Sequence, residues 1–238
     1  MKSSKKPSRK TGAKKRPRPI RRRFRIVVTA GPTREYFDAV RFLSNPSSGK
    51  MGYAIAEAAA KAGHEVALIS GPVAIAPPPN VKTIQVTTAA EMAAATKTAF
   101  RRADAAVLTA AVCDYRPKYR AKRKSAKTGR PKSVVLVPTE DIAAALGKNK
   151  GHRVTVAFAM ETHGGRARAE RKMLRKNCDA IVLNGPANVG SDQAAAEFLT
   201  QGSQWRRWPR VRKQALAARF LGELESLIAA RVSRPNRS

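Results

Sequence analysis

The chain has 238 residues, of which 42% are hydrophobic, and this is enough to bury the core of one α/β domain. No run approaches the roughly 20 consecutive apolar residues that cross a bilayer, and the N-terminus lacks the apolar run of a secretory signal. We therefore expect a cytoplasmic protein without a membrane partner. Cys113 and Cys178 have no cysteine or histidine at a metal-binding or redox spacing, so we expect two buried or half-buried reduced thiols.

The charge of the chain is strongly positive, with 48 Lys and Arg residues against 16 Asp and Glu residues. Residues 1–23 hold twelve of these cations and no acid, which predicts a disordered basic tail beside a folded domain at 24–232. Such a tail suits solvation, and it also suits a nonspecific contact with nucleic acid. The rest of the chain has a formal net charge of about +20, and this excess of positive charge favours anionic ligands.

Apolar runs and helical segments alternate along most of the chain. In chain order we expect a strand at 24–30, a helix from Gly49 to Gly63, a strand at 66–70, a strand at 81–86, a helix at 89–102 and a strand at 105–111. A short strand at 134–137, a helix at 141–146, a strand at 154–159, a helix at 166–177 and a strand at 180–183 follow. The alternation predicts a Rossmann-like, doubly wound, mainly parallel sheet in a three-layer α/β arrangement, without fixing the strand order.

Two regions depart from the alternation. Residues 115–132 hold nine Lys or Arg residues and no acid, together with Pro117, Gly129 and Pro131, and we interpret them as a mobile basic flap. After Asn184 we expect a hairpin through Phe198 and Trp205, and then a helix at 211–230.

The loop after the first strand predicts an anion site, because ligands of doubly wound sheets bind beyond the carboxyl ends of the strands. Ser47, Ser48 and Gly49 immediately precede a helix whose free N–H groups and positive dipole end attract anions, and Lys50 adds a charge. The alternative is that a serine only caps the helix. The segment is neither a Walker P-loop nor a GxGxxG motif.

Arg41 and Asn45 lie in the same loop, close in sequence to the expected phosphate site. Arg41 is suited to bind an anion in a bidentate manner, and Asn45 is suited to donate to a carboxylate or an acyl oxygen. On local grounds the turn chemistry of Asn45 before Pro46 explains this asparagine equally well.

Two further charged features follow the later strands. Asp114, just after the strand at 105–111, suits a ribose hydroxyl or a magnesium ion, and equally a pairing with a flap cation. Arg168, Lys172 and Lys176 recur every four residues and therefore share one helix face, where like charges cost a few tenths of a kcal/mol unless an anion binds. The flap lysines would suit closure over a polyphosphate, or simple solvation.

Taken in order, TAGPTRE, VRFLSNPSSGKMG, EVALISGPV, AVCDYRPK, VAFAMET and RKNCDAIVLN resemble the motifs of bacterial phosphopantothenate–cysteine ligase, also called phosphopantothenoylcysteine synthetase, over about residues 25–192. The resemblance implies ligation of 4′-phosphopantothenate to L-cysteine in coenzyme A biosynthesis, through an acyl-nucleotidylate formed from CTP with Mg²⁺. It also implies a homodimer. In bacteria this ligase is usually fused to a decarboxylase that is absent from this sequence, so a separate decarboxylase is expected to act on the product.

The resemblance also implies roles for individual residues. Asn45 matches the asparagine that stabilises the acyl intermediate, and Lys124 the flap lysine that engages phosphates. Nucleotide binding falls on Leu108, Thr109, Ala110, Asp114, Asp141, Ile142, Phe158, Lys172 and Lys176, with Asp114 also the candidate metal ligand. Phosphate or substrate binding is assigned to Gly31, Arg41, Ser47, Ser48, Gly49 and Lys50.

Some motifs differ from those of the family. The flap reads KSAK where the family reads close to KIKK, and the NPDI motif is replaced by Thr139, Glu140, Asp141 and Ile142. Because Glu140 adds a negative charge beside the expected nucleotide, ATP stays open as an alternative to CTP. A noncatalytic relative that binds nucleotide or nucleic acid through its basic tail and flap is the alternative function.

Overall fold

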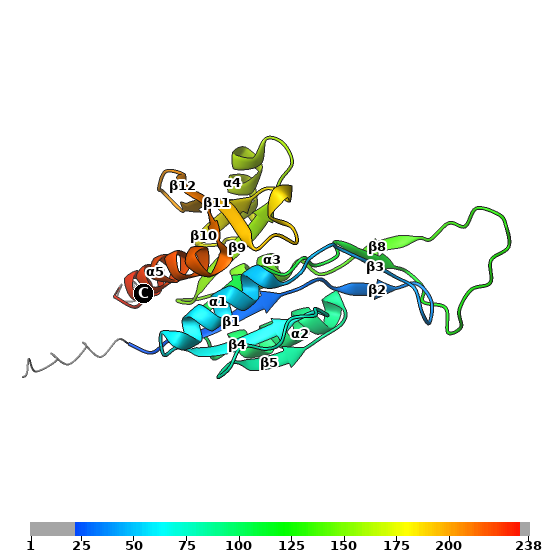
Figure 1. Cartoon of the computed structure of the whole chain (residues 1–238), viewed down its shortest axis with the longest axis horizontal. Helices are drawn as coiled ribbons and strands as arrows, with labels where there is room; N and C mark the ends of the chain where they lie inside the picture. Colours follow the sequence, from blue (N-terminus) through cyan, green and yellow to red (C-terminus); the bar gives the residue numbers. More distant parts are fainter. Residues whose placement is uncertain (1–21, 234–238) are drawn as a thin grey trace, which may run out of the picture.

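The structure is a computed structural model that describes residues 22–233, and residues 1–21 of the predicted basic tail lie outside it (Figure 1). Its central sheet has eight strands in the order β12-β11-β10-β9-β6-β1-β4-β5. Six are parallel: β1 Arg25–Ala30, β4 Glu65–Ser70, β5 Lys82–Gln85, β6 Ala105–Leu108, β9 Val154–Met160 and β10 Ala180–Asn184. At one edge β11 Gln193–Thr200 and β12 Arg206–Arg212 run antiparallel. The predicted Rossmann-like, mainly parallel sheet is confirmed.

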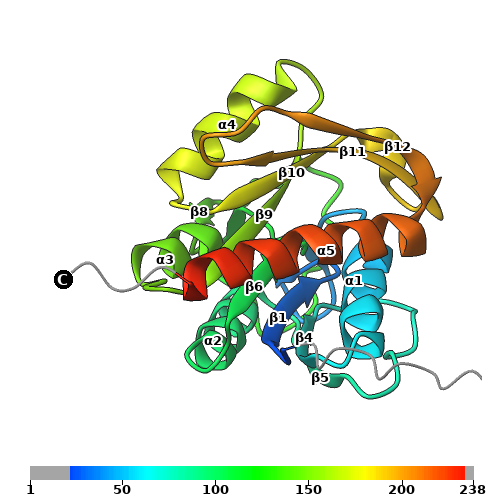
Figure 2. The same cartoon turned by 90° about the vertical axis from the view of Figure 1, so that its left-hand side faces the viewer.

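Helices cover both faces of this sheet, which gives the expected three layers (Figure 2). On one face α1 Lys50–Lys61 and α5 Lys213–Val232 share an apolar core with β1, β4 and the β11–β12 hairpin. On the other face lie α2 Ala89–Phe100, α3 Ile142–Lys148 and α4 Gly165–Arg175. None of the helices in residues 22–233 combines the length and the hydropathy needed to cross a membrane.

The direction of winding changes between β1 and β6, which are neighbours at the centre of the sheet. From β1 the chain winds outward to β4 and β5, then returns to β6 and winds the other way to β9 and β10. Beyond the carboxyl ends of two such strands their loops diverge and leave a crevice for ligands. Gly52 lets α1 approach this point closely, because a Cβ there would lie 2.6 Å from the Ala30 Cβ.

An arm projects from the body on the right of Figure 1. It contains a hairpin of β2 Arg34–Tyr36 and β3 Phe42–Ser44, and a second antiparallel pair of β7 Tyr115–Pro117 and β8 Leu136–Pro138. The loop expected after the first strand therefore folds partly as a hairpin, and the predicted strand at 134–137 begins two residues later. The first three residues of the predicted flap form β7, and the rest of it forms the far end of the arm, between β7 and β8.

The C-terminal hairpin is confirmed, although Trp208 rather than Trp205 is its buried tryptophan. The Trp208 ring stacks on Phe198 at a centroid distance of 5.0 Å, and both side chains are buried under α5. The last helix begins at Lys213, two residues later than predicted, because Val211 pairs with Ala194 in the sheet.

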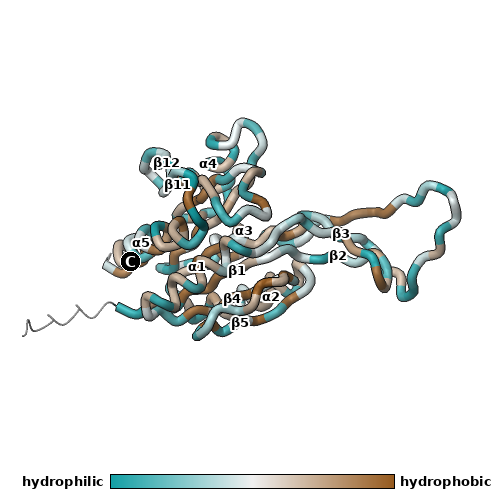
Figure 3. The backbone as a smooth tube through the Cα atoms, viewed as in Figure 1, coloured by the Kyte–Doolittle hydropathy of each residue, from teal (hydrophilic) through white to brown (hydrophobic). Residues whose placement is uncertain are grey.

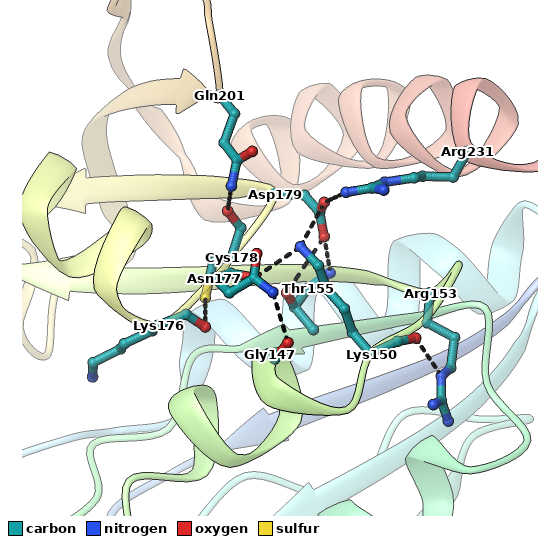
Figure 4. A network of polar contacts seen from close by, with 10 residues as sticks. All are labelled: Gly147, Lys150, Arg153, Thr155, Lys176, Asn177, Cys178, Asp179, Gln201 and Arg231. Atoms are coloured by element: carbon teal, nitrogen blue, oxygen red, sulfur yellow. Dashed lines mark hydrogen bonds and ion pairs between the residues drawn. The ribbon is translucent and has the colours of Figure 1, made fainter. Parts of the chain in front are cut away.

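A buried ion pair fastens the end of α5 to the sheet (Figure 4). Asp179, just before β10, accepts hydrogen bonds from the ammonium of Lys150 at 2.9 Å, from the amide N–H of Thr155 at 2.8 Å and from Arg231. Removing one partner of a buried ion pair would leave the other charge uncompensated, so this network holds the C-terminal end of α5 against the sheet.

Candidate active site

A cavity of about 540 Å³ lies at the point where the winding reverses. Its walls come from the loops after β1, β6, β9 and β10 and from the first turns of α1, α3 and α5. Most of the predicted site residues line it: Asn45, Ser47, Ser48, Gly49, Lys50, Leu108, Thr109, Ala110, Asp114, Asp141, Ile142, Phe158, Lys172 and Lys176. Gly31, Arg41 and Lys124 are not among its lining residues.

The first turn of α1 is open to a ligand. Gly49 is the N-cap in the left-handed conformation (φ 74°), and among the described residues no side chain caps the helix. Ser47 Oγ only accepts from the Gly49 N–H at 3.4 Å, so the alternative in which a serine caps the helix does not hold. Gly31 supports this turn from behind, because Gly31 and Gly49 both pack on Val73, within 2.9 Å and 2.8 Å of a hypothetical Cβ. The amide groups of the turn therefore present an uncapped positive dipole end to the cavity.

Asn45 bridges two loops of the cavity. Its Nδ2 donates to the carbonyl oxygens of Ala111 at 3.1 Å and Val112 at 3.2 Å, and it contacts the Cys113 sulfur at 4.0 Å. Turn chemistry before Pro46 accounts for the backbone of Asn45, but it does not account for these contacts of the side chain. The side chain is held between the loop after β1 and the loop after β6.

The lysine face of α4 lies at the other end of the cavity, and each of its lysines already has a carboxylate partner. Lys172 pairs with Glu161 at 2.5 Å, and Lys176 pairs with Asp141 at 3.1 Å. Asp141 also caps α3, accepting from the Ala144 N–H at 3.0 Å. The anion expected to offset the like charges on this face is thus supplied by the protein itself.

Comparison with known proteins identifies the family. Residues 22–227 match the model of the family described as DNA/pantothenate metabolism flavoprotein C-terminal domain. The chain belongs to this family. It is 40% identical to the coenzyme A biosynthesis bifunctional protein CoaBC of Escherichia coli K12, over 84% of this chain and 51% of that protein.

Two further similarities agree with this assignment. A cysteine/cysteine sulfinic acid decarboxylase from an unknown prokaryotic organism is 46% identical over 70% of this chain and 47% of its own length. The crystal structure of the C-terminal domain of a CoaBC protein superposes with a TM-score of 0.77 and 37% identity, covering 87% of this chain and 96% of that domain. The chain spans about half the length of the curated relatives that it matches.

The family motif places Arg41 four residues before Asn45, but the structure separates the two. Arg41 forms an ion pair with the buried Asp38 at 2.6 Å and donates to the Ser125 carbonyl oxygen of the flap at 2.8 Å. The expectation that Arg41 lies beside the phosphate site is corrected, because the β2–β3 hairpin carries it outward along the arm. Amide and guanidinium hydrogen bonds from Arg41 hold the pKa of Asp38 well below its ordinary value.

Lys124 occupies the flap beside Ser125, and the flap is fastened to the β2–β3 hairpin. The amide N–H of Ser125 donates to Asp38 at 3.3 Å, and the amide N–H of Ala121 donates to the Phe37 carbonyl oxygen at 3.0 Å. Lys124 therefore lies on the arm in this conformation and not in the cavity.

Asp114 lines the cavity directly after the loop that Asn45 contacts. Within residues 22–233 no group of three or more histidine, cysteine or acidic side chains could hold a metal ion. Magnesium, however, commonly takes one or two carboxylates and completes its shell with substrate phosphates and water. A single carboxylate at this wall fits a metal that arrives with a nucleotide.

Two polar residues of the cavity were not predicted from the sequence. Lys213 is 6% exposed and lines the cavity, and its ammonium donates to the Asn188 carbonyl oxygen at 3.0 Å. Asn184 Oδ1 is buried and has no hydrogen-bond partner among the described residues, although the side chain lines the cavity. The sequence signals for Asn184 were its position at the carboxyl end of a strand and its place as the last residue of the motif RKNCDAIVLN.

Both cysteines are buried free thiols, as expected. Burial raises the pKa of the Cys178 thiol to about 11, and it also raises the pKa of Cys113. Because a neutral thiol is a weak nucleophile, neither group is activated for covalent chemistry.

Proposed function

We propose that this domain joins 4′-phosphopantothenate to L-cysteine in coenzyme A biosynthesis, using CTP or ATP with Mg²⁺. The observation that carries the proposal is the position of Asn45, in the loop that leads into the uncapped start of α1 and bound to the loop after β6. Around it one cavity offers backbone donors for phosphate and a carboxylate, Asp114, for a metal or a ribose. These are the parts that activation of a carboxylate by a nucleotide requires.

In the proposed first step a carboxylate oxygen of 4′-phosphopantothenate attacks the α-phosphorus of the nucleotide. The bond from that phosphorus to the bridging oxygen breaks, its electron pair leaves with pyrophosphate, and an acyl-nucleotidylate forms. In the second step the cysteine amine attacks the acyl carbon, the nucleoside monophosphate leaves, and the amine loses a proton.

Asn45 is assigned to the acyl group, which carries negative charge on its oxygen during both steps. Its Nδ2 now donates to Ala111 and Val112 carbonyl oxygens, and rotation toward the ligand would exchange these acceptors for the acyl oxygen. A donor aimed at a developing oxyanion contributes about 10² to 10³ in rate.

The nucleoside is assigned to the wall made by residues 108–110, Asp141, Ile142, Phe158 and the α4 lysines, and the phosphates to residues 47–50. Mg²⁺, when bound, would neutralise phosphate charge beside Asp114. Closure of the flap would carry Lys124 toward the phosphates.

Choice between CTP and ATP stays open in this proposal. Glu140, the residue that adds an acid beside the nucleotide, is bound to Lys97 at 2.9 Å, so its charge is already compensated. Because Glu140 is paired, we assign the choice of base to the shape of the nucleoside wall and to its backbone N–H and C=O groups.

We propose that the domain acts in the cytoplasm as a homodimer that associates through its arm, and that a decarboxylase uses its product. Several apolar side chains of the arm are exposed, and Figure 3 shows an apolar stretch leading into β8. They are Val40, Phe42, Leu43, Tyr115, Val134, Val135 and Leu136. Clusters of this kind commonly mark a protein interface.

The test is release of pyrophosphate, measured with 4′-phosphopantothenate, L-cysteine, Mg²⁺ and either CTP or ATP. We expect release that requires 4′-phosphopantothenate, followed by amide formation that requires cysteine. Binding of RNA without such turnover would favour a noncatalytic relative instead. In this assay Asn45→Asp should keep nucleotide binding and lose at least about 100-fold in ligation rate, because a carboxylate cannot donate. Full activity of that variant would refute the role of Asn45.

A further inference from the structure

Two lysines occupy the first positions of two helices that pack against each other. Lys50 opens α1, and Lys213 opens α5. In the part of the chain that the structure describes, no side chain caps either helix, and neither first turn holds an acidic residue. A cation at the positive end of a helix dipole is unfavourable, and here this happens twice at neighbouring helix starts.

Burial adds to the penalty at Lys213, which is 6% exposed. Desolvation by burial, followed by repulsion from Lys50, lowers the pKa of Lys213, and Asp192 offsets only part of this effect. The Lys213 ammonium has the Asn188 carbonyl oxygen as an acceptor, and within residues 22–233 no carboxylate oxygen forms an ion pair with it.

The carboxylate that faces this cluster is already bound to the other lysine. Asp192 accepts from Lys50 at 2.5 Å, and Lys50 also donates to the Gly190 carbonyl oxygen at 3.1 Å. The Asp192 side chain is 84% exposed, so it is free to move into solvent when a stronger anion arrives. Arg210 adds a further positive charge near Lys213.

Both lysines line the candidate active site, next to the uncapped turn at residues 47–49. They also line a second hollow of about 390 Å³, which Asp192 and residues 75–79 help to form. The lysines therefore line both hollows, and the starts of α1 and α5 lie on the opposite side of the molecule from α4 (Figure 2).

We infer that Lys213, Lys50 and the first turns of α1 and α5 form a subsite for the terminal diphosphate of the nucleoside triphosphate, with Asp192 as the resident counter-ion that the phosphates displace. This inference rests on the proposed function and adds the residue that binds the leaving group. In the first step the electron pair of the broken bond moves onto this diphosphate, and two ammonium groups stabilise the charge that develops there.

The test measures binding of inorganic pyrophosphate, without metal, to the full chain by calorimetry. Lys213→Met keeps the length of the side chain and removes its charge, and it should weaken binding at least about tenfold. Lys213→Arg should restore the affinity to within about threefold. Lys82→Met, on the exposed edge strand β5, is the control that changes the net charge equally, and it should bind like the wild type.

Asp192→Asn provides a second variant that does not disturb a buried residue. It removes the competing carboxylate, so pyrophosphate should bind about threefold more tightly or better. The subsite is overturned if the wild type does not bind pyrophosphate, if Lys213→Met behaves like Lys82→Met, or if Asp192→Asn binds no more tightly. Should Lys213→Met fail to fold, the Asp192→Asn result decides.

Product formation separates this inference from the proposed function. Pyrophosphate binding that depends on Lys213, without any ligation by the wild type, would retain the subsite and reject the ligase. Ligation by the wild type with a Lys213→Met variant of unchanged nucleotide KM would retain the ligase and reject the subsite.

Discussion

The two ends of the cavity both carry lysines, but they balance the charge differently. At the α4 end each lysine has its own carboxylate, with Lys172 on Glu161 at 2.5 Å and Lys176 on Asp141 at 3.1 Å. At the other end only Lys50 pairs with a carboxylate, the mostly exposed Asp192, and Lys213 has no ion-pair partner within residues 22–233. Cations that lack dedicated partners are more informative about a missing anionic ligand than cations that are merely numerous.

The largest expected effect comes from removing both charges of the second end. Lys50→Met with Lys213→Met should weaken pyrophosphate binding about 100-fold, or about 2.7 kcal/mol, because two charge-assisted hydrogen bonds are lost. The matched control is Lys172→Met with Lys176→Met, which should change the dissociation constant of pyrophosphate by less than about threefold. Equal losses from both double variants would remove the distinction between the ends.

The second effect is a pH dependence of about tenfold at the Lys213 end. Burial lowers the pKa of Lys213, and only its protonated form attracts phosphate. The affinity for pyrophosphate should therefore be full below this lowered pKa and should fall as the pH rises through it. The fall should occur at a lower pH than the value of about 10.4 at which an exposed lysine titrates. Lys213→Arg stays charged throughout. The dissociation constant of pyrophosphate is therefore measured for the wild type and for this variant from pH 7 to 10, and the ratio of the two values cancels the titration of pyrophosphate itself. A constant ratio would contradict the assignment.

A smaller effect is expected at the α4 end. Glu161→Gln releases Lys172 from its counter-ion, and we expect the KM for the nucleotide to fall about threefold, the size of a partly exposed ion pair. Glu170→Gln, on the exposed surface of α4, is the matched control and should leave KM unchanged. A rise in KM would show that Glu161 serves the nucleotide in another way.

The smallest effect on the cavity is expected from the arm. Asp38→Asn should speed amide exchange of peptides covering residues 37–41 and 121–126, measured by mass spectrometry, while pyrophosphate binding stays the same. The depressed pKa of Asp38 means that its carboxylate stabilises the arm above its ordinary value of 3.8 and loses this contribution in stronger acid. Wild-type protection of these amides should accordingly fall only below that pH.

Local patterns predicted the parts of the fold whose signals are local. The Ala-rich segment after Gly49 predicted α1, and the apolar runs at 24–30 and 154–159 predicted β1 and β9. The β2–β3 hairpin was missed because its strands have three residues each and those of β3 are exposed, so they show no periodicity. This omission also explains why Arg41 was expected beside the phosphate. Arg41 is only four residues before Asn45 in sequence, but the hairpin places it on the arm.

The cavity was predictable where one motif supplies several residues, as in SNPSSGKMG, and much less where distant segments meet. Lys213 lies more than 160 residues after Lys50 and becomes part of the wall because the β11–β12 hairpin leads into α5, which packs on α1. The spacing of Lys172 and Lys176 located their shared face correctly. Their partners Glu161 and Asp141 come from other loops, and helical spacing alone could not reveal them.

The most direct measurement uses 4′-phosphopantothenate labelled with ¹⁸O in its carboxylate, incubated with the protein, cysteine, Mg²⁺ and CTP or ATP. Attack on the α-phosphorus predicts that one ¹⁸O atom appears in the nucleoside monophosphate, together with unlabelled pyrophosphate. Label in inorganic phosphate beside a nucleoside diphosphate would contradict the account, because the attack would then have fallen on the phosphorus assigned to the Lys50 and Lys213 end.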